Sequence, residues 1–234
     1  MYHYQSLLAV LLFAFVHLFA EKARRLPLGF RRRFLSAGSG IAIAYVFIDL
    51  MPKLSKFEPV VTNAIKPFFP LFERHVYVMA LLGFLLFFLV DRGKSILDGK
   101  PAYLYLSLSS YAIFNLFIGY AVVDVKNPEV QPLALFSLAL ALHYFVNDYS
   151  LTETLGEQYD HVAKWILIAF LFIGWFLGLL FELPPAAVGL ISAFIGGGVI
   201  MNVTRHELPE GHPTSVPALI VASIVYTAIL LMIG

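Results

Sequence analysis

The chain has no cysteine among its 234 residues. This absence excludes disulfide bonds, cysteine-ligated zinc, iron–sulfur clusters and thiol catalysis. Charged side chains are also scarce, at 13% of the chain, which is about half of their share in an average soluble protein. The net charge of +1 argues against a nucleic-acid partner. Because no phosphate-binding loop, dinucleotide fingerprint or nucleophile elbow occurs either, we expect the protein not to be an enzyme.

Apolar residues, in contrast, make up 60% of the chain, and the mean hydropathy is +0.82. They gather in runs that each approach the roughly 20 residues with which a helix crosses a bilayer. The eight runs cover residues 4–21, 34–52, 72–90, 102–124, 132–150, 162–182, 185–204 and 215–233. They are far longer than the about 9–11 residues of a barrel strand. The sequence therefore predicts an all-α polytopic membrane protein with eight transmembrane helices in a single transmembrane domain, residues 1–234, surrounded by a lipid bilayer.

The distribution of lysine and arginine predicts the orientation. The first apolar run is followed, not preceded, by a basic cluster, so we expect a retained first span rather than a cleaved signal peptide. With the N-terminus outside, eleven of the sixteen basic side chains fall in inside loops and five lie outside. We therefore expect a multi-pass protein of the cell (inner) membrane with both termini outside.

The most polar stretch within an expected span is Ala139–Asp148 of the fifth run. His143 and Asn147 stand at i and i+4 on one helix face, as paired metal ligands do, and Asp148 follows Asn147. Asn115 adds an amide in the middle of the fourth run. Because polar groups in a bilayer usually face a bundle interior, a pore or a metal, we expect these four residues to form a metal site. The alternatives are a neutral histidine bonded to a neighbouring helix and an asparagine that only joins two helices.

A second set of polar residues lies near the ends of the expected spans. We predict that these side chains line a pathway, although each has an alternative reading as an interfacial or loop charge: Asp49, Glu182, His206, Glu207 and Glu210. His17 and Glu21, at i and i+4 in the first run, are expected to be a packed pair rather than a site. Residues 53–71, the longest irregular stretch, contain three prolines and are expected to form an outside loop, with or without a short interfacial helix.

Two distant parts of the chain resemble each other weakly. Residues 34–52 and 190–209 both open on a Ser-Ala and glycine-rich stretch and end with an acidic residue, a leucine and a proline. These parts belong to the expected spans two and seven, which run in opposite directions across the membrane. Inverted repeats of this sort are typical of transporters.

At these positions the chain resembles the ZIP family of divalent metal transporters. Asp49–Pro52 at the end of span two is similar to that family's His-Leu-Leu-Pro-Glu, and Glu207–Glu210 ends span seven in a similar way. Phe114–Gly119 in span four is similar to the family's His-Asn-x-x-Asp/Glu-Gly. His143–Asp148 in span five is similar to its His-Glu-x-Pro-His-Glu.

The resemblance implies a ZIP-like fold in which spans 1–3 and 6–8 form an inverted repeat, and it implies a homodimer. It also implies ion transport by alternating access around a mid-membrane site for zinc, iron or manganese, with zinc as the first choice and no cofactor beyond that ion. The chain departs from the family pattern where ligands are expected, at Phe114, Ile118 and Tyr144. Val146 replaces a helix-breaking proline, and Asn147 replaces a histidine or glutamate.

Three functions therefore stand side by side. The first is a ZIP-like transporter, or transporter-derived binder, of divalent metal ions. The second is a non-transporting membrane scaffold that has lost its ligands, for which Phe114 and Ile118 argue. The third is an intramembrane metal-dependent hydrolase, since catalytic zinc takes three protein ligands and an open position, with residues of suitable type at Ser39, Asp49, His143, His206 and His212.

Overall fold

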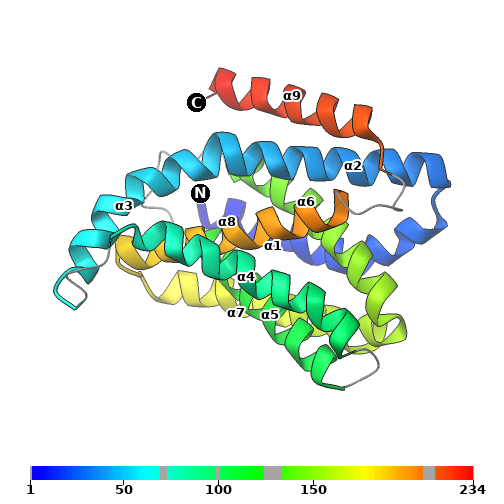
Figure 1. Ribbon diagram of the computed structural model, residues 1–234, viewed down its shortest axis with the longest axis horizontal. Helices are drawn as coiled ribbons and strands as arrows, with labels where there is room; N and C mark the ends of the chain where they lie inside the picture. The colour runs from blue at the N-terminus through cyan, green and yellow to red at the C-terminus, as the bar shows by residue number, and fades with distance from the viewer. Residues whose placement is uncertain (1, 69–72, 98–100, 124–132, 208–213, 234) are drawn as a thin grey trace.

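The computed structural model describes residues 2–68, 73–97, 101–123, 133–207 and 214–233. Within these ranges the chain forms helices and no strand (Figure 1), which confirms the predicted all-α fold. The long helices are α1 (Tyr2–Phe19), α2 (Leu28–Tyr45), α3 (Met51–Ile65), α4 (His75–Ile96), α5 (Pro101–Ala121), α6 (Leu133–Leu155), α7 (Lys164–Leu180), α8 (Pro185–Glu207) and α9 (Val216–Ile233). A 3-10 turn, Ala20–Arg25, follows α1, and π-helical turns precede α3 (Val46–Leu50) and α7 (Tyr159–Ala163).

Seven helical stretches of the described chain are long and apolar enough to cross a membrane, as expected of a polytopic membrane protein. They are Tyr4–Lys22, Leu28–Ile65, His75–Ile96, Pro101–Ala121, Tyr159–Leu180, Pro185–Arg205 and Val216–Ile233. The fifth expected span, residues 132–150, corresponds to α6, which is not among these seven because His143, Asn147 and Asp148 make its C-terminal half polar. These side chains are buried among other helices, so protein rather than lipid surrounds them.

The predicted irregular loop at residues 53–71 is wrong for its first part, because α3 continues α2 as one long helical stretch (Figure 1). Pro52 has no backbone N–H group to donate, and its ring would clash with the preceding turn of a regular α-helix. The π-helical turn Val46–Leu50, which is wider than an α-helical turn, makes room for this ring. Leu54 and Val61 of α3 are buried, and α3 packs against α8. Burial of this apolar face therefore keeps the segment helical despite its prolines.

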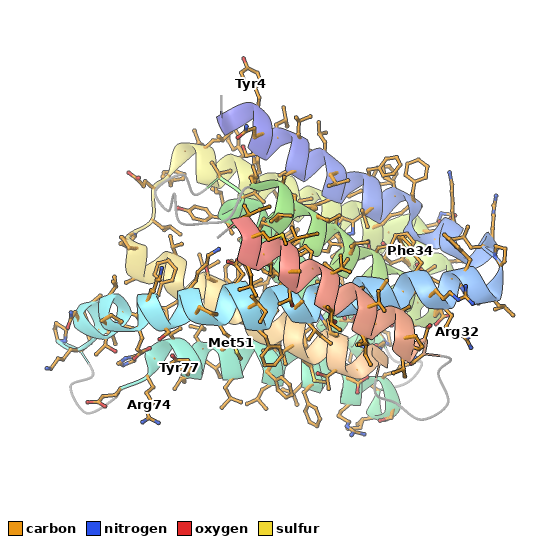
Figure 2. The ribbon with its side chains drawn as sticks, turned by 90° about the horizontal axis from the view of Figure 1, so that it is seen from above. Tyr4, Arg32, Phe34, Met51, Arg74 and Tyr77 are labelled. Atoms are coloured by element: carbon orange, nitrogen blue, oxygen red, sulfur yellow. The ribbon has the colours of Figure 1, made fainter. Side chains whose placement is uncertain are left out.

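The long helices associate in two sets of pairs. α4 packs along α8 and α2 along α9, while α5 packs along α7 and α1 along α6. Figure 2 shows α9 lying across α2. In the expected inverted repeat, spans 1, 2 and 3 correspond to spans 6, 7 and 8, and span 4 corresponds to span 5. Under this correspondence the pair α4–α8 becomes α9–α2, and the pair α5–α7 becomes α6–α1. The packing therefore has the pattern that an inverted repeat would produce.

Three of these pairs, α4–α8, α2–α9 and α5–α7, meet where a glycine faces the backbone of the partner helix. A Cβ atom added to Gly197 of α8 would overlap the carbonyl oxygen of Ala80 in α4. A Cβ atom at Gly40 of α2 would overlap the carbonyl oxygen of Leu219 in α9. Both glycines belong to the glycine-rich stretches of spans two and seven, so these stretches allow close backbone approach between membrane helices.

Candidate functional site

The polar half of α6 presents two faces to its surroundings. Tyr144 and Asp148 stand at i and i+4 on one face, and His143 and Asn147 stand at i and i+4 on the next. All four side chains are at most 2% exposed. α6 packs against α1 and α2 and also contacts α8, and side chains of α5 reach the same two faces.

Asp148 belongs to a closed cluster with His17 of α1 and Asn115 of α5, which we call the His17 cluster. His17 Nδ1 lies 2.6 Å from Asp148 Oδ2, and His17 Nε2 lies 2.9 Å from Asn115 Oδ1. The cluster therefore joins three helices that are far apart in sequence. The predicted packed pair of His17 and Glu21 is wrong, because Glu21 instead lies 3.6 Å from Lys164 Nζ.

The hydrogen bonds of the His17 cluster also indicate where its protons lie. Asn115 Nδ2 donates to the backbone carbonyl of Tyr111 over 2.9 Å, which leaves the amide oxygen of Asn115 facing His17. Both nitrogens of His17 thus face oxygen atoms, one from an amide and one from a carboxylate. His17 Nε2 therefore carries a proton that it donates to Asn115, and a second proton is shared between His17 Nδ1 and the Asp148 carboxyl group.

His143 and Asn147 differ from the His17 cluster in having no partner among the described residues. Both ring nitrogens of His143 and both amide atoms of Asn147 are buried without a hydrogen bond. A buried polar group left without a partner costs about 1–3 kcal/mol. Such groups are uncommon in native proteins and usually indicate a bound ion, a water or a functional role. This His143–Asn147 pair is therefore the strongest candidate for a ligand-binding position.

Aromatic side chains close one side of the His143–Asn147 pair. The Phe114 ring of α5 lies 5.9 Å from the His143 ring and 5.4 Å from the Phe87 ring of α4, measured between centroids. Phe114 and Ile118 are both fully buried. A Cβ atom added to Gly198 of α8 would lie 3.1 Å from the Phe114 ring. Phe114 therefore fills the space beside His143 and Gly198.

Asn202 of α8 is a buried amide that the sequence analysis missed. Its side-chain oxygen accepts a long hydrogen bond of 3.4 Å from the Tyr111 hydroxyl, and its Nδ2 has no partner in the described chain. Ser39 of α2, equally buried, also has no partner for its hydroxyl there. The sequence contained a signal for Asn202, because it is a single amide within the apolar run of span seven. His17, by contrast, was noticed but was assigned to the wrong partner.

Of the predicted pathway residues, the structure describes the side chains of Asp49 and Glu182. Asp49 is buried, and its Oδ2 lies 2.6 Å from Lys53 Nζ on the next helical turn. Glu182 is exposed in the segment between α7 and α8. His206 and Glu207 end α8, but their side chains lie outside the description. Glu210 and His212 lie outside the described residues.

The four predicted metal residues fall into two groups. Asn115 and Asp148 both bond to His17, while His143 and Asn147 remain unpaired. Within the described part of the chain, no three histidine, aspartate or glutamate side chains come together as a metal-binding group. A metal at the His143–Asn147 pair would therefore have one imidazole and one amide from this pair, and would need water or other oxygen donors in addition.

No protein-family model matches this chain, and no curated protein matches it.

Proposed function

We propose that this protein is a ZIP-like transporter, or transporter-derived binder, of divalent metal ions, with His143 and Asn147 as the residues that contact the ion. The observation that carries the proposal is the pair of unbonded, fully buried ring nitrogens of His143. Imidazole nitrogen and amide oxygen are donors that zinc and related borderline cations accept. The helix pairing adds support, because an inverted repeat is the architecture with which many transporters alternate access.

Asn115 and Asp148 enter this proposal as reserve ligands. Both bond to His17 in the described geometry, so they reach an ion only after those bonds break. A change of that kind between two helix arrangements is what alternating access would supply. Of the four predicted ligands, His143 and Asn147 thus form the primary pair. Asn115 and Asp148 can bind the ion only when they are not bonded to His17.

A non-transporting scaffold is the second candidate, and a specific observation favours it. Phe114 and Ile118 occupy fully buried positions where the ZIP pattern has ligands, and the described residues hold no three-residue metal-binding group. In that case the His17 cluster would be a structural link between α1, α5 and α6. The hydrolase hypothesis has no comparable support, because Asp49 is paired with Lys53 and makes no hydrogen bond to His143 among the described residues.

The test is the metal content of the purified, detergent-solubilised protein, measured by elemental mass spectrometry after loading with zinc, iron or manganese. We expect about one ion per chain in the wild type and a loss of at least tenfold in affinity in His143→Ala and Asn147→Ala. His161→Ala is the matched control, because His161 is an exposed histidine on the turn before α7. Asp148→Asn separates a reserve ligand from a primary one, since it should reduce uptake into vesicles more than it reduces binding.

Wild-type protein that holds no metal after loading would overturn the metal proposal and favour the scaffold. Equal loss in His143→Ala and His161→Ala would also contradict it, because surface histidines would then account for the bound metal. Metal that binds but is not carried into reconstituted vesicles would leave a binder rather than a transporter.

A further inference from the structure

A large cavity lies at the end of the bundle where α2 begins and where α4, α6 and α8 end. Its volume is about 960 Å³, and residues of these four helices line it together with Thr214 before α9. Arg32, which lines it, lies at one end of the molecule, and Arg74 lies at the opposite end (Figure 2). Val146 and Met201 also line it, and each is the sequence neighbour of a buried amide, Asn147 or Asn202. The cavity therefore extends along the bundle to about the level of these two amides.

The lining of this cavity is strongly basic. Among the described residues that line it, five basic side chains outnumber two acidic ones, Asp91 and Glu153; the basic ones are Arg31, Arg32, Arg92, Lys94 and Arg205. Both acidic groups already have partners, because Arg205 Nε lies 2.8 Å from Asp91 Oδ1 and the Tyr149 hydroxyl donates to Glu153 over 2.6 Å. We call this space the basic cavity.

Two arginines of the basic cavity have no acidic partner among the described residues and could bind a ligand. Neither Arg32 nor Arg92 pairs with an acidic side chain among the described residues, and Arg92 lies over the Phe88 ring at 5.4 Å. Both are exposed to the cavity rather than packed away in the core. A planar guanidinium donates two parallel hydrogen bonds to a phosphate or carboxylate, so unpaired arginines in a concave site favour an oxyanion.

The start of α2 adds a second, independent feature. Leu28 and Gly29 begin this helix and line the basic cavity. The first turn has no acidic residue, and no side chain caps it. Its backbone N–H groups and the positive end of the helix dipole thus lie at the cavity without a side-chain acceptor. A Cβ atom added to Gly29 meets no atom within 4 Å, so space is open above this helix end.

We propose that the basic cavity binds a phosphate group, held by Arg32, Arg92 and the N-terminal turn of α2. Helix N-termini and arginine forks are the two common protein devices for binding phosphate, and here they share one cavity. The phosphate belongs either to a soluble molecule or to the headgroup of an anionic lipid. This inference is independent of the proposed metal site, since no metal takes part in it.

The first arm of the test uses inorganic phosphate. Thermal unfolding of the purified protein is followed during a phosphate titration, against chloride at equal ionic strength. A ligand that binds only the folded protein raises its melting temperature in a concentration-dependent way. We expect Arg32→Gln with Arg92→Gln to weaken phosphate binding at least tenfold, because both charged donors are lost. Gly29→Leu should weaken it as well, by filling the open space without changing charge.

The matched control is Arg25→Gln with Arg33→Gln. It removes the same charge from exposed positions that do not line the basic cavity. The control should bind phosphate as the wild type does. A loss as large as that of the cavity variant would overturn the proposal, because binding would then depend only on overall charge.

The second arm uses native mass spectrometry of the protein in micelles that contain phosphatidylglycerol or phosphatidylcholine. Retention of phosphatidylglycerol by the wild type and the control, with loss in Arg32→Gln/Arg92→Gln, supports a lipid headgroup as the source. A response to inorganic phosphate without lipid retention supports a soluble phosphate compound. The absence of both responses in the wild type would overturn the proposal.

Discussion

At the residue scale, neighbouring buried side chains of α6 differ in whether they have a hydrogen-bond partner. Asp148 is bonded to His17, while His143 and Asn147 are buried with no partner in the described chain. The first arrangement stabilises the fold only as long as both partners are present. The second costs stability, and that is the pattern expected where a ligand completes the hydrogen bonding. The contrast separates a structural group from a binding group on a single helix.

The pairing of His17 with Asp148 predicts a non-additive pair of mutations. His17→Leu or Asp148→Leu alone leaves a buried polar group without its hydrogen-bond partner, and each should lower the free energy of unfolding by about 1–3 kcal/mol. The double variant removes both polar groups, so its loss should be clearly smaller than the sum of the single losses. Denaturant unfolding in detergent measures these differences, with His161→Leu as an exposed control within about 0.5 kcal/mol of the wild type. Additive losses would show that the two residues act independently.

At the element scale, glycine positions determine how closely the helices pack. The pair α4–α8 depends on Gly197, whose Cα faces the carbonyl oxygen of Ala80, and the pair α2–α9 depends on Gly40 in the same way. Without a hydrophobic driving force between helices in lipid, such close contact is a main source of association. The small-residue stretches thus hold the pairs together.

A comparison of two glycines tests this role. Gly197→Ala puts a methyl group where the backbone of α4 lies, so we expect it to lower the free energy of unfolding by about 1–3 kcal/mol or more. Gly29→Ala meets no atom within 4 Å and should be neutral, or stabilising by up to about 1 kcal/mol, because alanine is the better helix former. Unfolding curves in detergent give both values. Equal behaviour of the two variants would contradict the assigned packing.

At the scale of the whole molecule, charge is distributed unevenly although the net charge is only +1. The basic cavity gathers five of the sixteen basic residues at one end of the bundle. The lysine and arginine distribution predicts that this end lies inside. A positive end would repel a divalent cation that leaves the bundle there, and a bound phosphate would offset that repulsion. The two proposed sites are thus compatible, although neither depends on the other.

The absence of cysteine makes the predicted orientation directly testable. Arg32→Cys and Arg74→Cys each introduce a single thiol, at opposite ends of the molecule (Figure 2). In intact cells a membrane-impermeant maleimide should label Arg74→Cys and not Arg32→Cys, and permeabilised cells should show both. Labelling of Arg32→Cys alone in intact cells would reverse the orientation. Labelling of both in intact cells would contradict a membrane-spanning arrangement.

The sequence by itself determined the helical, membrane-spanning character of the chain. Backbone groups in lipid must bond within their own segment, so a long apolar run becomes a helix whatever its neighbours are. Only the tertiary structure decided the partners of the polar residues. His17 and Asp148 are 131 positions apart, and no local pattern relates them. For the same reason residues 53–65 are helical against expectation, because contact with α8 outweighs the local effect of proline.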